Sequence, residues 1–296
     1  MLTGIVAGLL AGALWGLVFV APRMVPAIPG VDFASGRFVA YGLMALVVTG
    51  WRRHRPLPTA RQALAAVGLS VLGFTGYYLL LVLAIRDAGT EVPSLIIGTI
   101  PLWVMLLGKP GHLRWAALVP GVVLTAAGLA LMMATQHPAA GAVHGAHYWR
   151  GILLVTGALA AWTAFALLNA AWLKRHPEVD VTDWANWLGL ATGAGALLLW
   201  ALAGSDLALL RADPQAPLFL LLCLATGFGS AWLATILWNV ASRRLPASLC
   251  GQLIVSETLF ALAYSFLWDG RWPSLPQAAA VLLFTLGILA SVKAHR

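Results

Sequence analysis

A single carboxylate, Glu257, lies inside the apolar run "QLIVSETLFALAYSF" at residues 252–266. A charged side chain at the centre of a bilayer costs about 2.5–3.5 kcal/mol on insertion scales, so Glu257 is expected to face the protein interior. Three roles fit it: binding a substrate ammonium group, carrying a coupling proton, or a structural hydrogen bond to a neighbouring helix. Gln252 and Ser256 share one helix face, and Thr258 adds a polar group. This polar stripe favours a helix that faces a lumen over one that faces lipid.

Several aromatic residues fall near the middle of other apolar runs. Their indole N–H and phenol O–H groups need hydrogen-bond partners, which lipid does not supply. Packing between helices and the lining of a cavity are both open for each residue, but for the set we favour a central aromatic cavity. Such a cavity suits a flat apolar or aromatic solute by stacking, and a lipophilic cation by cation–π attraction. The candidate substrate-binding residues, with the polar groups above, are Trp15, Tyr77, Tyr78, Trp103, Trp162, Trp232, Gln252 and Glu257.

Arg37 is the only other charge within an apolar run, about one turn from its outer end. It can snorkel or pair with an acidic residue, so a structural or gating ion pair is favoured over binding a substrate carboxylate. Nine further tryptophans lie at the ends of the runs, where the amphipathic indole prefers the membrane interface. They are Trp51, Trp115, Trp149, Trp172, Trp184, Trp187, Trp200, Trp268 and Trp272.

Enzyme and metal-site patterns are missing from the sequence. His137, His144 and His147 have spacings that could bind a metal, but a flexible, solvated loop is the favoured interpretation. No HExxH, GxSxG or glycine-rich phosphate loop occurs. Cys223 and Cys250 both lie in apolar runs and imply no disulfide framework. We therefore predict no catalytic residues, no cofactor and no metal.

The composition requires a membrane for these residues. The chain is 61% hydrophobic and 9% charged, with a mean hydropathy of +0.88, whereas soluble domains carry about 25% charged residues. Since a bilayer needs about 20 apolar residues per helix, we expect an all-α integral membrane protein with ten transmembrane helices. Their expected ranges are 3–21, 32–51, 62–85, 91–108, 115–134, 150–173, 184–203, 217–240, 248–268 and 275–292.

The net charge of +8 lies in short loops beside the helix ends and is a topology signal, not a sign of nucleic-acid binding. If the N-terminus is cytoplasmic, the inner loops and C-terminus hold twelve of the 18 basic residues and the outer loops five. This bias obeys the positive-inside rule with both termini in the cytoplasm. A cleaved signal peptide is not expected, because "MLTGIVAGLL" lacks a basic n-region.

The longest polar connection divides the chain into two five-helix halves, 1–134 and 150–296, with an outer connecting loop at 135–149. An odd number of helices per half predicts an inverted-topology repeat, as in many secondary transporters. Residual self-similarity supports it: Trp15 pairs with Trp162, "GF" at 73–74 with "GF" at 227–228, "PSL" at 93–95 with "ASL" at 247–249, and Gly128 with Gly287. The second and seventh helices show no defensible similarity. Hinges or ordinary close packing both fit Pro93, Pro101, Gly227 and Gly229.

Nearly the whole chain resembles EamA-type members of the drug/metabolite transporter superfamily. The resemblance rests on "LLAGALWGLVFVAPR", "FASGRFVAYGLMAL", "AIRDAGTEVPSLIIGTIPLWVMLLG", "LPASLCGQLIVSETLFALAYSF" and "AAAVLLFTLGIL". It implies a ten-helix inverted-repeat carrier with both termini cytoplasmic. Within the family, the sequence looks most like bacterial aromatic amino-acid exporters of the YddG type. Two departures concern substrate specificity: Thr258 replaces a proline common after the glutamate, and "WDG" replaces a common Gly-Glu.

These observations predict an exporter of neutral aromatic amino acids or related metabolites in the bacterial inner membrane, working by alternating access as a single chain. The alternative is a proton-coupled exporter of lipophilic cationic drugs. Small multidrug transporters of the superfamily use a glutamate in their first helix, and this chain has no carboxylate there. A non-transporting scaffold is a third hypothesis, which the polar stripe at mid-membrane disfavours.

Overall fold

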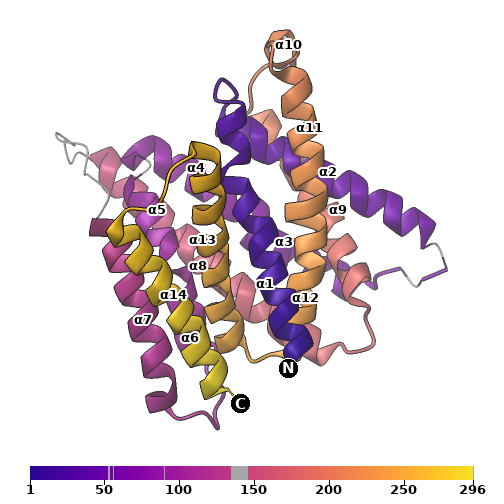
Figure 1. Cartoon of the computed structure of the whole chain (residues 1–296). Coiled ribbons are helices and arrows are strands. Elements are labelled where there is room, and N and C mark those ends of the chain that lie inside the picture. Colours follow the sequence, from indigo (N-terminus) through magenta and orange to yellow (C-terminus); the bar gives the residue numbers. More distant parts are fainter. Residues whose placement is uncertain (53, 56, 90, 135–145, 296) are drawn as a thin grey trace.

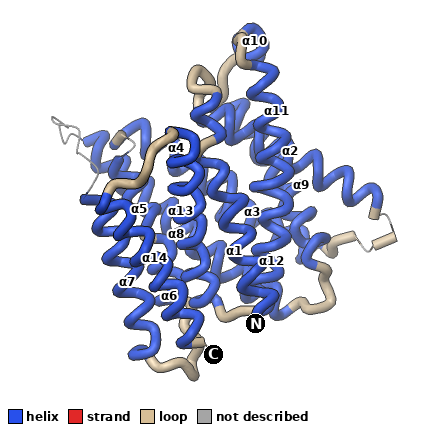
Figure 2. The backbone as a smooth tube through the Cα atoms, viewed as in Figure 1, coloured by secondary structure: helices blue, strands red, loops and turns tan. Residues whose placement is uncertain are grey.

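The computed structural model describes residues 1–52, 54–55, 57–89, 91–134 and 146–295, and these ranges contain helices and no strands (Figures 1 and 2). Most of the expected connecting loop, including His137 and His144, lies outside the described residues. The first half comprises α1 (Leu2–Gly16), two 3-10 turns (Leu17–Phe19 and Ala21–Met24), α2 (Gly30–Trp51), α3 (Ala60–Ser70), the π-helical segment η3 (Val71–Thr75), α4 (Gly76–Ala88), α5 (Glu91–Gly98), α6 (Ile100–Leu107) and α7 (Trp115–Ala134).

The second half repeats this order of long helices. It comprises α8 (Ala146–Arg175), α9 (Val181–Ala203), the short α10 (Leu207–Ala212), α11 (Ala216–Thr226), the π-helical segment η4 (Gly227–Leu233), α12 (Ala234–Arg244), α13 (Ala247–Asp269) and α14 (Leu275–Ala294). Each half therefore has one long helix, α3–α4 or α11–α12, that contains a π-helical segment. The "GF" dipeptides that the repeat pairs both lie in these two segments.

Nine helical runs in the described residues are long and apolar enough to span a membrane. The expected fourth span is shorter, at Val92–Leu107, and is broken into α5 and α6 at Thr99. The Thr99 hydroxyl donates to the carbonyl of Ile96 at 2.6 Å, and Pro101 occupies the first turn of α6, where its missing N–H is tolerated. Both termini lie at the same end of the molecule (Figure 1), which requires an even number of crossings.

Contacts between helices follow a twofold pattern. The equivalent helices of the two halves pack against each other as α2 with α9, and α7 with α14. These pairs form opposite flanks of the molecule (Figures 1 and 2). In the order of the two halves, α8 corresponds to α1 and α12 corresponds to α4. The contact of α1 with α12 therefore has its counterpart in the contact of α8 with α4. This is the pattern that two inverted five-helix halves give.

Glycines allow both flanking pairs to approach closely. Gly128 of α7 lies against the ring of Phe284 in α14, and Gly287 of α14 lies against Thr125 of α7, so each of these paired glycines faces the opposite helix. Gly42 of α2 and Gly193 of α9 meet backbone to backbone, because a Cβ on either would lie 2.8 Å from the other's Cα. The sequences of these two helices show no similarity, although each contributes one glycine to the point where the helices cross.

Two tryptophans expected at the membrane interface are instead buried. Trp184 and Trp187 are 0% and 8% exposed, because α9 begins at Val181, one turn earlier than the expected span at 184. Trp172 stacks on Trp184 with ring centroids 3.5 Å apart and planes 12° apart. Both residues lie near the end of the span, as expected, but their rings pack in a core between α3, α8 and α9 and do not face lipid.

Candidate functional site

The crossing of α1 and α13 sets the depth of Glu257. A Cβ on Gly12 would collide with the Ser256 hydroxyl, and one on Gly16 would lie 2.9 Å from the backbone N of Ala261. These two glycines therefore let α13 pack directly on α1. A Cβ on Gly12 would also lie 3.1 Å from the backbone N of Glu257, so Glu257 begins at the level of Gly12, three residues before Trp15 in α1.

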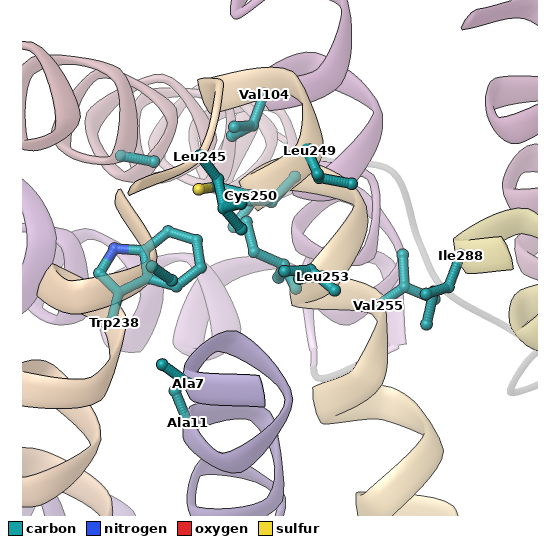
Figure 3. Close-up of a cluster of buried hydrophobic side chains, with 14 of the residues drawn as sticks. Ala7, Ala11, Val104, Trp238, Leu245, Leu249, Cys250, Leu253, Val255 and Ile288 are labelled. Atoms are coloured by element: carbon teal, nitrogen blue, oxygen red, sulfur yellow. The ribbon is translucent and has the colours of Figure 1, made fainter. Parts of the chain in front are cut away.

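Trp15 belongs to a cluster of three tryptophans drawn from α1, α8 and α12. Its ring centroid lies 6.4 Å from that of Trp162 and 5.3 Å from that of Trp238, and Trp162 and Trp238 are 6.4 Å apart. We call these three residues the tryptophan cluster. Trp15 and Trp162 are partly exposed, whereas Trp238 is 1% exposed. Figure 3 shows Trp238 in the buried core with Leu245, which follows α12, and Leu253 of α13.

Sequence reasoning paired Trp15 with Trp162 but did not identify Trp238. The expected eighth span ended at 240, which placed Trp238 near a helix end, whereas α12 continues to Arg244. The two arginines at the helix end were the available signal, since long basic side chains can snorkel to the interface and allow the helix to continue past residue 240. The structure brings Trp15 and Trp162 into contact, as a site on the axis between two halves requires.

Arg37 of α2 and Glu257 of α13 lie within electrostatic range of each other, and Tyr77 of α4 lies within range of both. All three side chains are partly exposed. In the described part of the chain no carboxylate comes within 4.0 Å of the Arg37 guanidinium, which lies 4.6 Å from the ring centroid of Phe38. Its buried Nε has no hydrogen-bond partner there either. The structural ion pair expected for Arg37 is thus not formed in this conformation, and its gating role stays a prediction.

The other candidate residues have partners of their own. The Tyr78 hydroxyl donates to the carbonyl of Gly30 at 3.0 Å, and the Trp232 indole donates to Asn186 Oδ1 at 2.8 Å. Trp103 is 47% exposed and its indole donates to Thr99 Oγ1 at 3.2 Å. These bonds satisfy the polar groups of the three side chains within the fold, and substrate binding by them stays a prediction.

Gln252 is fully buried and links three helices. Its amide Nε2 donates to Thr125 Oγ1 of α7 at 2.9 Å, and its Oε1 accepts from the Ser291 hydroxyl of α14 at 2.9 Å. With both ends of the amide bonded and no exposed surface, these contacts favour a structural role. Substrate binding by Gln252 remains only a prediction.

A second buried polar group, which sequence reasoning missed, joins α8, α9 and α12. The Asn169 amide donates to Asn239 Oδ1 at 3.1 Å, and its own Oδ1 accepts from the Trp184 indole at 2.8 Å. All three side chains are fully buried, at 0% exposed. Asparagine within a membrane helix was the signal, because an amide in that environment requires bonded neighbours.

Helix irregularities surround the central region. Where α1 gives way to a 3-10 turn, the carbonyls of Ala13 and Leu14 accept hydrogen bonds from Tyr264 at 3.2 Å and Ser230 at 2.6 Å. The segments η3 and η4 widen two other helices, and π-helical segments are frequent at functional sites. Gly227 and Gly229 lie within η4, so these candidate hinges fall where the helix is already irregular.

This region holds a cluster of indole rings, and the same bundle holds Glu257 and Arg37, whose opposite charges form no direct ion pair among the described residues. In the described residues no group of three or more His, Cys, Asp or Glu side chains could hold a metal ion. His147, the one described member of the histidine group, is exposed near the start of α8.

Comparison with known proteins identifies relatives over the full length. The profile of the EamA-like transporter family matches residues 2–134. The inner membrane protein YtfF of Escherichia coli (strain K12) is 33% identical over 308 residues, covering 99% of this chain and 96% of that protein. A solved crystal structure with 20% sequence identity superposes with a TM-score of 0.78 and covers 98% of each chain, which shows a shared fold.

Proposed function

Because this chain belongs to the EamA-like transporter family, whose members carry small molecules across membranes, we propose that it exports neutral aromatic amino acids or related metabolites. The proposed mechanism is alternating access by two inverted five-helix halves. Relative movement of the halves is supported by the twofold contact pattern and by the helix irregularities at the centre. In this reading the protein is a multi-pass inner-membrane protein that works as a single chain.

The observation that carries this proposal is the tryptophan cluster, in a bundle that also holds the unpaired opposite charges of Glu257 and Arg37. A neutral amino acid is a zwitterion, so its ammonium group can bind Glu257 and its carboxylate can bind Arg37. Its aromatic side chain can then pack edge-on or offset against Trp15 and Trp162, which retain exposed surface. A lipophilic cation fits the same rings and Glu257, but Arg37 would repel it.

Proteoliposome transport tests the proposal. Purified protein is reconstituted with labelled tryptophan, phenylalanine or a lipophilic cation on one side, with and without a pH gradient. Saturable flux of the amino acids is expected, together with a drop of about tenfold or more when Trp15 or Trp162 is replaced by alanine, since each aromatic contact contributes about 0.5–1.5 kcal/mol beyond its buried area.

The matched control is Trp272→Ala, because Trp272 is 93% exposed and remote from the cluster in sequence and fold. Transport by that variant should equal that of the unaltered chain. Gradient-driven flux of the cation without amino-acid flux would replace the proposal by the drug-export alternative. Unchanged amino-acid flux in both Trp15→Ala and Trp162→Ala would remove the tryptophan cluster from the binding site.

A further inference from the structure

A cavity of about 460 Å³ opens at the end of the molecule that carries both termini. It lies between the end of α8, the connection from α12 to α13, and the loop that joins α6 to α7. Its polar lining consists of Lys174, Arg243, Arg244 and His112, and no acidic residue lines it. Three permanent positive charges therefore surround one recess.

Carbonyl groups, not carboxylates, hold two of these cations in place. Lys174 Nζ donates to the carbonyl of Leu245 at 2.7 Å, and Arg243 Nη2 donates to the carbonyl of Val179. These bonds orient the side chains without cancelling their charge. No carboxylate lies within 4.0 Å of Lys174, Arg243 or Arg244 in the described part of the chain.

Two acids near this end act on Arg243 at longer range. They are Asp180 and Glu178, which line a separate, smaller cavity. Asp180 is already engaged by Arg52 at 3.1 Å and by the N–H groups at the start of α9. Arg243 also keeps a buried Nε that has no hydrogen-bond partner among the described residues. The first cavity thus retains positive charge that no close carboxylate neutralises among the described residues.

The deeper walls of the cavity are apolar. Leu167 lies seven residues before Lys174 on α8 and so about 10 Å farther into the molecule. Leu245, Ala170 and Ala171 line the same recess. A cationic mouth above an apolar wall matches an amphipathic anion, whereas a small soluble anion gains nothing from the apolar part. The N-terminus of α13 at Ala247, which has no side-chain cap, adds its positive dipole end.

We propose that this cavity binds an anionic phospholipid, with the headgroup phosphate held by Lys174, Arg243 and Arg244 and an acyl chain along Leu167 and Leu245. Basic recesses between transmembrane helices are a known mode of lipid headgroup recognition. The bound lipid joins the end of α8 to the link between α12 and α13. These second-half helices contact α1, α4 and α6 of the first half. Occupancy should therefore stabilise the folded protein.

Thermal unfolding of the purified protein in a neutral detergent, followed by its tryptophan fluorescence, tests this proposal. The additions are phosphatidylglycerol, phosphatidylcholine, or glycerol phosphate at the same headgroup concentration. Phosphatidylglycerol should raise the Tm more than phosphatidylcholine does. Arg244→Gln should remove about half or more of that difference, because a ligand that binds only the folded state stabilises it by RT ln(1 + [L]/Kd), and loss of a phosphate contact raises the Kd.

Arg244 is the informative position because its side chain is exposed and, unlike Lys174 and Arg243, caps no carbonyl that the fold requires. Arg175→Gln is the control: the same charge change at an exposed residue of the same end, outside the cavity lining. Equal effects of the two lipids, or equal losses in Arg244→Gln and Arg175→Gln, would overturn the site. An equal Tm increase with glycerol phosphate would overturn the lipid as its occupant in favour of a soluble phosphate ester.

Discussion

Glu257 keeps a carboxylate at a depth where its desolvation opposes folding. Its neighbours Gly12 and Gly16 fix its position, but no described cation forms an ion pair with it within 4.0 Å. A site that must receive a substrate ammonium group has to leave its carboxylate unpaired in this way. Under the proposed role, stability and transport therefore make opposite demands on this one residue.

The substitution Glu257→Gln separates these demands. It keeps the shape of the side chain and removes the charge, so the Tm should stay equal or rise, while transport of a zwitterionic amino acid should fall by about tenfold or more, because a hydrogen bond to a charged group contributes about 1.5–3 kcal/mol. Fluorescence-monitored melting and proteoliposome flux measure the two quantities on one preparation. A large fall in Tm would instead assign Glu257 a structural role.

The hydrogen bond between Trp184 and Asn169 allows a double-mutant cycle. Asn169→Ala leaves the indole N–H of the buried Trp184 without its acceptor, which should cost about 1–3 kcal/mol and lower the Tm. In a Trp184→Phe background that donor is gone, so the same substitution should cost less. Equal Tm losses in both backgrounds would show that this bond contributes nothing measurable to stability.

At the scale of helices, the sequence predicted most of the fold for a simple physical reason. A bilayer demands about 20 apolar residues for each crossing, and charges and prolines between such runs are visible in the sequence. The break at Thr99 was foreseen only as one of two alternatives for the nearby Pro101, a hinge or close packing, because a local turn held by the Thr99 hydroxyl changes no hydropathy. Likewise, Gly42 and Gly193 form a contact that a search for similar stretches does not detect, since a close crossing requires one small residue per helix rather than a shared motif.

The crossing of α2 and α9 gives a prediction on one helix. Gly42→Val should separate the two helices and lower stability by about 1–3 kcal/mol or more, because its Cβ would meet the backbone of Gly193 and the carbonyl of Gly189. Gly50→Val is the matched control on the same helix, where an added Cβ meets nothing within 4 Å. The measurement is the difference in Tm between the two variants. Comparable losses in both would mean that helix propensity, not the crossing, governs the effect.

At the scale of the whole molecule, the candidate site was predictable only in part. Central depth in each span identified Trp15 and Trp162, because depth follows from position along a helix. It could not show which way a side chain points, so Trp103 was included although 47% of it is exposed. Arg37 and Glu257 could be recognised as charges within apolar runs, but their nearness to Tyr77 depends on how α2, α4 and α13 cross.

The orientation of the molecule in the membrane is the last prediction. Both termini lie at one end, and the bias of basic residues predicts that this end is in the cytoplasm, because positively charged loops are retained on the cytoplasmic side.

A cysteine at Trp272, which is 93% exposed beyond the far end of α13, should therefore react with a membrane-impermeant maleimide in intact cells. A cysteine at Leu57, which is 78% exposed in the loop between α2 and α3, should react only after lysis. The native Cys223 and Cys250 are 3% and 2% exposed and should contribute little background. The opposite labelling pattern would invert the predicted topology and place both termini outside the cytoplasm.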